Sequence, residues 1–227
     1  MAPNRPADSS GPVLGIDTSF AAAVGVAGIV RQSEDPRGQV EQLSPLIAEA
    51  LQEANLQVSD LSAIAAGTGP APYTGLRIGL ATARALAFAL GIPVWGVPAL
   101  DALAADAAAR LSPPPGSRIL AALDAKRRET YWALYLAAGA APPRLTEGPA
   151  VGPPTSVPPA DVVAAGGSEE YRAALCPTPG TPDRVNPLVV VELAVLRAAQ
   201  GLAQPSDPVY LRRPDIAPPA PRKRVTR

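Results

Sequence analysis

The chain has 227 residues, equal numbers of acidic and basic side chains, one cysteine and no histidine. This length allows one large domain or two small ones, and zero net charge gives the whole molecule no strong attraction to nucleic acid or acidic membranes. The missing histidines exclude Ser-His-Asp and Cys-His catalysis and His-containing zinc sites, and a single cysteine excludes an internal disulfide. A metal site would need carboxylate and carbonyl ligands, which suit Mg²⁺ or Ca²⁺.

No targeting or membrane-spanning segment is evident in the sequence. The chain does not start with a charged region followed by an apolar core, as a signal peptide does. The longest apolar stretches are interrupted by Arg77 and Arg84 and are too short to cross a bilayer. We therefore expect a soluble cytoplasmic protein that begins with a polar, proline-containing, disordered tail over residues 1–12.

The first predicted elements are two strands and an amphipathic helix. Residues 13–17 form an apolar run that ends in an aspartate, and residues 21–30 return as a second strand. Apolar side chains then fall at helical spacing over residues 39–54. Pro45 lies inside that pattern, so the helix either starts near Ser44 or is kinked.

Residues 63–98 read as strand, loop, helix and strand. A short apolar run at 63–66 is followed by a Gly/Pro-rich loop and a helix with Thr74 as its predicted N-cap. Gly91, with a proline two residues later, predicts that the helix ends near Leu90. Residues 94–97 form the next buried strand. This βαβ unit predicts a parallel sheet with a right-handed crossover.

Small residues recur every four positions along this helix. Gly75, Gly79, Ala83 and Ala87 therefore share one face. Glycine inside a helix costs about 0.5–1 kcal/mol relative to alanine, so the stripe indicates that another backbone comes close. Two interpretations stay open: the stripe packs against the chain's own sheet, or it meets a helix of another protein.

The second half of the chain resembles the first. Residues 118–124 form a buried strand that again ends in an aspartate, and residues 130–137 return as a strand. The two halves thus share the order strand, aspartate, turn and returning strand, which we interpret as a weak internal repeat of the fold. Residues 126–129 form a charged turn, a pattern most often typical of a solvated face.

The remaining predicted elements are mostly helical. Residues 101–111 form an alanine-rich helix, residues 161–165 a strand and residues 171–175 a helical turn. Residues 188–199 form the last long helix, and an Asn-Pro pair at residues 186–187 suits its N-cap and first position.

Two aspartates at equivalent strand ends are the first candidate site. Ligands of open α/β sheets bind beyond such strand ends, so Asp17 and Asp124, with Gly166 and Gly167, form the pattern of an actin-like or sugar-kinase-like ATPase. Neither turn has the glycine two places after the aspartate that would let backbone amides face a phosphate. An independent ATPase or small-molecule kinase is therefore one hypothesis, and aspartates that merely cap their turns are the alternative.

Two further segments are candidate anion sites. The loop over residues 67–75 precedes a helix and suits an anion, but it lacks the lysine of a P-loop, so a tight strand-to-helix connection is favoured. The sequence finishes with a basic tail. A third hypothesis is that this tail binds RNA through its phosphates, and the alternative is that it only improves solubility. Its cations include Arg222, Lys223, Arg224 and Arg227.

Four segments carry a resemblance to a known family. VLGIDTS near the start, GTGPAPYTGLRIGLATARALAFALGIPVWGVPALDALA, LAALDAKRRETYWALY, and PVYLRR near the end resemble the TsaB (YeaZ) family. The resemblance implies an α/β actin-like (ASKHA, RNase H-like) fold with two related subdomains, whose mixed sheets are flanked by helices. We accordingly predict an N-terminal subdomain at 13–103, a C-terminal subdomain at 104–213 and a basic, proline-rich tail at 214–227.

The same resemblance implies a function and partners. TsaB-like proteins are non-catalytic scaffolds in bacterial tRNA threonylcarbamoyladenosine synthesis, without a cofactor or metal of their own. The implied partners are the catalytic paralogue TsaD and the ATPase TsaE, with tRNA present only within the complex. A homodimer is expected to be possible when TsaD is absent. No membrane partner is implied.

The resemblance also implies site residues in two places. The helices matching residues 39–54 and 74–90 are expected to pack against the partner, through Gln39, Gln42, Leu43, Leu46, Tyr73, Gly75, Leu76, Arg77, Gly79, Leu80, Ala83 and Ala87. The vestigial nucleotide site is expected at Asp17, Asp124, Gly166 and Gly167. The family usually has glycine and a small hydroxyl residue where this chain has Ala71 and Pro72, and often histidine where it has Gln39.

Overall fold

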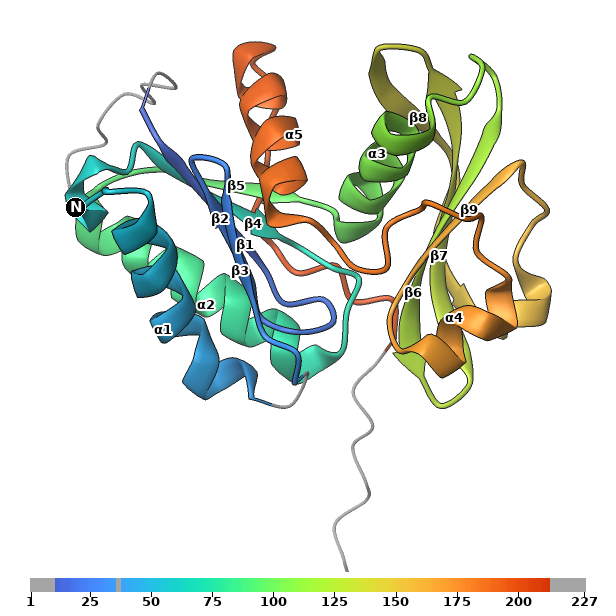
Figure 1. Cartoon of the computed structure of the whole chain (residues 1–227), viewed down its shortest axis with the longest axis horizontal. Helices are drawn as coiled ribbons and strands as arrows, with labels where there is room; N and C mark the ends of the chain where they lie inside the picture. The colour runs from blue at the N-terminus through green and yellow to red at the C-terminus, as the bar shows by residue number, and fades with distance from the viewer. Residues whose placement is uncertain (1–10, 36–37, 213–227) are drawn as a thin grey trace, which may run out of the picture.

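The chain folds around two β-sheets, with helices between and outside them (Figure 1). The computed structural model describes residues 11–35 and 38–212, without the side chains of Gln39 and Val40. Most of the predicted N-terminal tail and the whole predicted C-terminal tail lie outside these residues, so their predicted character stays a prediction. No helix in the described ranges is long and apolar enough to cross a membrane.

The first sheet has five strands in the order β3-β2-β1-β4-β5. The central strand β1 pairs antiparallel with β2 and parallel with β4, and the register places Gly15 opposite Gly25 on one side and Ala65 on the other. Helices cover both faces of this sheet, so its central strands are continuous apolar runs without alternation. The strands are β1 (Val13–Asp17), β2 (Ala23–Val26), β3 (Ile29–Gln32), β4 (Ala63–Gly67) and β5 (Val94–Val97).

The second sheet repeats this topology with four strands in the order β8-β7-β6-β9. Its first strand β6 pairs antiparallel with β7 and parallel with β9, as β1 does with β2 and β4. The internal repeat predicted from the two aspartate-ending strands is therefore confirmed. The strands are β6 (Arg118–Lys126), β7 (Glu129–Ala138), β8 (Ala141–Gly152) and β9 (Val162–Gly166).

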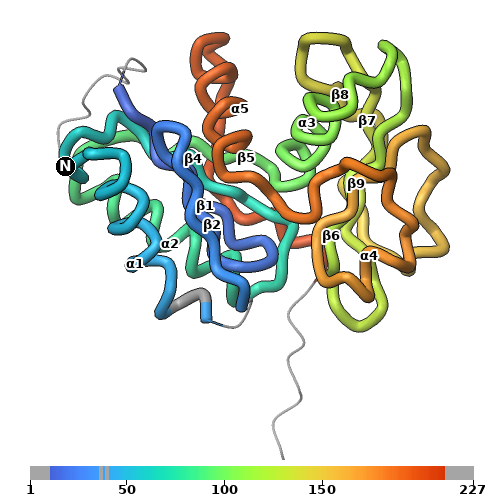
Figure 2. The backbone as a smooth tube through the Cα atoms, viewed as in Figure 1, coloured from blue at the N-terminus to red at the C-terminus, as the bar shows by residue number. Residues whose placement is uncertain are grey.

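Five α-helices complete the described fold. α1 and α2 cover one face of the first sheet and α5 covers the other, while α3 packs against the second sheet and α4 lies beside β9. Figure 2 shows that the orange end of the chain returns from the second sheet to the first. The helices are α1 (Gln39–Glu53), α2 (Tyr73–Leu90), α3 (Ala99–Leu111), α4 (Glu169–Leu175) and α5 (Pro187–Ala199), and short 3-10 turns lie at Val58–Asp60 and Pro154–Ser156.

Apolar side chains form separate cores on the two sides of the first sheet. One core lies between this sheet and helices α1 and α2, with Leu14, Ile64, Leu43 and Leu76 fully buried. A larger core joins the other face to α3, α5 and the second sheet. The predicted boundary between residues 103 and 104 falls inside α3. The division into two subdomains stays a prediction.

The observed helix boundaries agree with two of the sequence predictions and differ from two others. Gly91 ends α2 in the left-handed conformation at φ 67°, as predicted. Asn186 caps α5 by accepting a hydrogen bond from the Leu188 amide, also as predicted. The predicted N-cap Thr74 is wrong, because α2 already begins at Tyr73. α1 runs through Pro45 instead of starting near Ser44, since its apolar face is buried on the sheet.

Two strand predictions also change. The single strand predicted at 21–30 is the hairpin of β2 and β3, because Ala27 and Gly28 adopt positive φ values of 47° and 84° and turn the chain. β8 was not among the predicted strands, because its two prolines near residue 142 are typical of a loop. This strand is at the edge of its sheet, where proline is tolerated, and its register against β7 shifts beside these prolines.

Candidate functional site

The small residues of α2 face the chain's own core. Gly75, Gly79, Ala83 and Ala87 are all buried, and the Thr18 hydroxyl donates a hydrogen bond to the Gly75 carbonyl at 2.9 Å. A Cβ atom on Gly79 would lie 2.3 Å from Thr18 Oγ1, so glycine is needed where the helix meets the turn after β1. The stripe therefore packs within the chain, and the interpretation that it receives a helix of another protein is wrong.

The opposite face of α2 is open to solvent. Arg77, Ala81, Arg84, Ala85 and Phe88 are exposed and follow helical spacing along one side. Phe88 is 78% exposed, more than any other exposed large hydrophobic residue in the described part of the chain. An aromatic ring in water beside alanines marks a surface suited to protein contact.

α1 lies beside α2 and extends this surface. Its inner side packs Leu43 and Ile47 into the core, and its outer side exposes Pro45 and Ala48. Leu46 is half-buried between the two sides. We use the name outer helical face for the exposed residues Pro45, Ala48, Arg77, Ala81, Arg84, Ala85 and Phe88.

The chain after α5 holds one flank of α2. Arg84 donates hydrogen bonds to the Ser206 carbonyl at 2.7 Å and to the Asp207 carboxylate at 3.1 Å. Arg77 Nε donates to the Tyr210 hydroxyl at 3.0 Å. Both arginines of the outer helical face are thus fixed by the chain after α5.

The first aspartate of the repeat is buried in its own turn. Asp17 is only 3% exposed, and it accepts hydrogen bonds from the Ser19 amide and the Ser19 hydroxyl, each at 2.9 Å. A Cβ atom on Gly67 would lie 2.1 Å from Asp17 Oδ2, so the carboxylate fills the space beside β4. Burial raises the pKa of Asp17 to about 6, and the bonds from Ser19 only partly oppose this.

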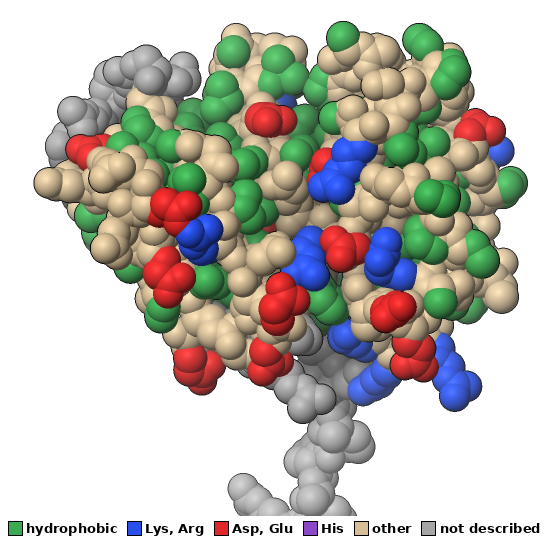
Figure 3. Space-filling model, in the orientation of Figure 1, with side chains coloured by type: hydrophobic (Ala, Val, Ile, Leu, Met, Phe, Trp, Pro, Cys, Tyr) green, Lys and Arg blue, Asp and Glu red, His purple; other side chains and the backbone are tan. Residues whose placement is uncertain are grey.

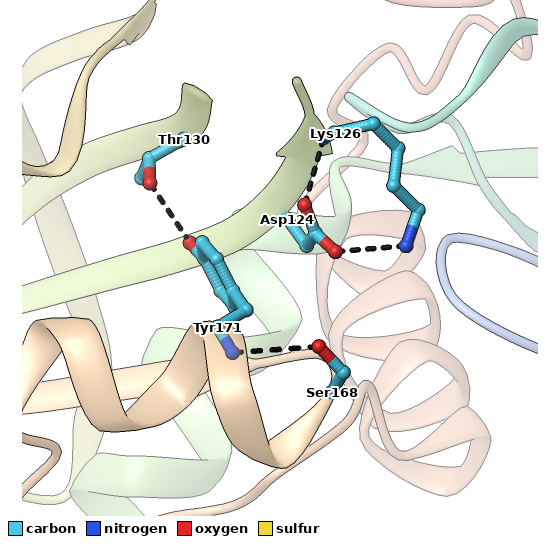
Figure 4. A network of polar contacts seen from close by, with 5 residues as sticks. All are labelled: Asp124, Lys126, Thr130, Ser168 and Tyr171. Carbon is cyan, nitrogen blue, oxygen red and sulfur yellow. Dashed lines mark hydrogen bonds and ion pairs between the residues drawn. The ribbon is translucent and has the colours of Figure 1, made fainter. Parts of the chain in front are cut away.

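The second aspartate is held by a cation. The Lys126 amide donates to Asp124 Oδ1 at 2.7 Å, and its ammonium group pairs with Oδ2 at 2.8 Å (Figure 4). The Tyr171 ring stands beside Asp124, where a Cβ atom on Gly167 would lie 2.9 Å from a ring carbon. The space beside Gly167 is therefore occupied by Tyr171, which also bonds with Thr130 at 3.2 Å, and the space beside Gly166 is occupied by Leu123 and the backbone at Asp183.

The two aspartate turns approach each other without forming an open site. Lys126 Nζ lies 5.7 Å from the centre of the Phe20 ring, so it links the turn after β6 to the turn after β1. The cavity beside Asp17 has a volume of about 10 Å³, which is enough for one water molecule. Within the described residues, no group of three or more acidic or cysteine side chains is placed to hold a metal ion.

The loop before α2 is used in backbone pairing. Thr68 bonds with Val97 and Val209 through its amide and carbonyl, and the Gly69 carbonyl accepts from the Ala99 amide at 2.8 Å. These bonds favour the interpretation of the loop as a tight strand-to-helix connection.

The predicted partner-contact residues fall into two groups. Seven are buried beneath the helices and support the outer helical face from below: Leu43, Gly75, Leu76, Gly79, Leu80, Ala83 and Ala87. Four reach the surface at least in part: Gln42, Leu46, Tyr73 and Arg77. The side chain of Gln39 lies outside the described residues. Phe88 and Arg84 were missed, although their spacing from Arg77 along the helix places them on the same side.

Three comparisons with known proteins bear on this site. Residues 30–144, just over half of the chain, match the family model described as TsaD: tRNA N6-adenosine threonylcarbamoyltransferase. An uncharacterised protein of Mycobacterium tuberculosis is 38% identical over 216 residues, 91% of this chain and 94% of that protein. The tRNA threonylcarbamoyladenosine biosynthesis protein TsaB of Escherichia coli is 34% identical over 128 residues, 54% of each chain.

Solved structures resemble the whole fold. The structure of YeaZ from Pseudomonas aeruginosa superimposes with a TM-score of 0.70 at 30% identity and covers 88% of this chain and 100% of that one. That protein has the actin-like fold, so the predicted fold class is confirmed.

Proposed function

The chain belongs to the TsaB/YeaZ family, and from this premise we propose that it is a non-catalytic scaffold subunit in the threonylcarbamoylation of tRNA. In this proposal it pairs with a TsaD-like catalytic paralogue, which modifies the adenosine beside the anticodon. A TsaE-like ATPase joins the assembly, and the reaction takes place in the cytoplasm. Family membership supports a role in this pathway; the partners and the absence of catalysis are the proposal.

The main support for pairing with a TsaD-like paralogue is the exposed outer helical face. Phe88 stands in water on an eighteen-residue helix, flanked by small alanines that let a partner backbone come close. Burying a phenylalanine side chain contributes about 2 kcal/mol, and aromatic residues at the centre of an interface commonly dominate binding. The similarity of residues 30–144 to the TsaD model supports a paralogue that presents an equivalent pair of helices.

The aspartate turns support a scaffold more than an enzyme. Asp17 is buried in its own turn, Asp124 is neutralised by Lys126, and Tyr171 occupies the space at Gly167. A Mg²⁺-nucleotide would need ionised carboxylates that point into open space. Both carboxylates are instead engaged by residues of their own turns.

Reconstitution tests the proposal. The purified chain, its catalytic paralogue and the ATPase are mixed with unmodified tRNA, and modification is assayed with and without this chain. Modification that requires the chain, together with a complex in light scattering, is the expected result. The Asp17→Ala variant is expected to leave modification largely intact. A loss as large as omission of the chain would revive a nucleotide site at Asp17.

The alternative, an ATPase or kinase that uses Asp17 and Asp124, makes a different prediction. ATP at about 100 times its Kd would stabilise the isolated chain by about 2.7 kcal/mol, which a thermal shift detects easily. We expect no shift. A clear shift that Asp17→Ala abolishes would favour the enzyme over the scaffold.

A further inference from the structure

The turn between β6 and β7 holds three consecutive cations in an unusual backbone conformation. Lys126, Arg127 and Arg128 have φ angles of 62°, 54° and 63°, in the left-handed region. This conformation costs a residue other than glycine or asparagine about 1 kcal/mol. A turn that keeps three long cationic side chains there, where glycine would fit without strain, is a candidate for function.

Two of these cations, Lys126 and Arg127, line a cavity beside the start of α2. Its volume is about 190 Å³, and cations and tyrosines line most of it: Lys126, Arg127, Arg212, Tyr73, Tyr131 and Tyr210. The Tyr210 ring is partly exposed and lies 5.1 Å from the Tyr73 ring. The Arg77 guanidinium packs over Tyr73 at 4.0 Å, so the aromatic surface is held in place from behind.

Among the residues that the structure describes, cations outnumber carboxylates at this corner. Asp124 pairs with Lys126 at 2.8 Å and Glu129 pairs with Arg212 at 3.0 Å. Arg127 and Arg128 are both exposed, and within the described residues Arg128 has no ion pair. Figure 3 shows Lys and Arg side chains gathered, with some acidic ones, at the lower edge of the half that carries the second sheet.

We propose that this cationic corner, defined as Lys126, Arg127, Arg128, Arg212 and Tyr210, binds an RNA strand. The cations contact backbone phosphates, and the exposed Tyr210 ring stacks against an unpaired base. The inference rests on the proposed function, in which the substrate is a tRNA. Because Tyr73 begins α2, the corner adjoins one end of the outer helical face, and RNA held by a partner there is within reach.

The dimensions favour a polymer over a small ligand. Pockets that enclose small molecules usually have volumes of about 300–1,000 Å³, and this cavity is smaller. Charges spread along a turn match phosphates spaced along a strand. An acidic protein segment would also pair with the cations but would gain little from an aromatic ring, so RNA uses more of the observed surface.

The test compares two double variants of the full chain. Arg127→Gly/Arg128→Gly removes two charges and relieves the backbone, whereas Arg127→Lys/Arg128→Lys keeps both charges. Binding to labelled unmodified tRNA is measured by fluorescence anisotropy from about 50 to about 200 mM salt, for the chain alone and for its complex with the catalytic paralogue. Arg144→Gln, an exposed arginine on β8, is the matched control.

The glycine variant is expected to bind tRNA about tenfold more weakly at low salt, and the slope of its log affinity against log salt concentration should be smaller by about two. The lysine variant and Arg144→Gln should bind like the parent chain. Tyr210→Ala should weaken binding to single strands more than Tyr210→Phe does. Equal binding by the glycine and lysine variants, or equal competition by polyglutamate or ATP, would overturn the inference. Light scattering measures pairing with the paralogue independently of tRNA binding. A failure of the RNA-binding inference can therefore be told apart from a failure of the proposed function.

Discussion

The turns after β1 and β6 occupy equivalent places in the internal repeat, yet the first is buried and the second faces solvent. Asp17 is buried, bonds with Ser19 and lies under α2, where the neighbouring Thr18 meets Gly75. Asp124 pairs with Lys126 at the rim of a solvent-facing turn that carries two more cations. The same backbone plan thus supports a helix in one half and presents charge in the other.

The difference shows how a repeated fold can divide its tasks. The first turn makes contacts inside the chain, so changes there should act on stability. The second turn faces solvent, so changes there should act on ligands and leave stability almost unchanged. Three substitutions test this division, and their expected effects decrease in order.

Gly79→Leu should have the largest effect. Its side chain would collide with Thr18, which is buried and bonded to α2, so we expect the free energy of unfolding to fall by about 3 kcal/mol. Urea denaturation measures this loss. Ala81→Leu on the outer helical face is the control and should change stability by less than about 0.5 kcal/mol. Similar stabilities for the two variants would place the small stripe outside the core.

Asp17→Asn should remove a pH dependence. The folded-state pKa of Asp17 is raised to about 6 from 3.8, so the native protein holds this proton more tightly than the unfolded chain does. The contribution of Asp17 to the free energy of unfolding therefore falls as pH rises through this window, by about 2–3 kcal/mol in total. The free energy of unfolding is measured against pH for the parent chain and for Asp17→Asn. Parallel curves between about pH 4 and about pH 7 would contradict the raised pKa of Asp17.

Lys126→Met should have the smallest effect. It breaks the ion pair with Asp124, but the lysine side chain is 54% exposed, and exposed pairs contribute about 0–1 kcal/mol. Thermal denaturation at low and high salt measures the change. A loss comparable to that of Gly79→Leu would mean that the second turn is also a structural support.

Sequence periodicity predicted most strands, the long helices and the repeat, because apolar runs and helix-end signals are local. It identified the small stripe of α2 but left open which way the stripe faces, since that depends on the turn after β1, whose approach to the helix is a tertiary contact. β8 was missed because its prolines are tolerated only at a sheet edge. The left-handed backbone of residues 126–128 has no sequence signal, so the turn read as an ordinary solvated face.

Titration of the chain with its TsaD-like paralogue tests the central claim, that the outer helical face is the docking surface, most directly. Phe88→Asp should weaken binding at least about tenfold without loss of stability, because the most exposed aromatic side chain would be replaced by a charge inside the interface. Leu145→Asp, at another exposed large apolar side chain, is the matched control and should bind like the parent chain. Equal affinity of the parent and Phe88→Asp would place the docking surface elsewhere on the molecule.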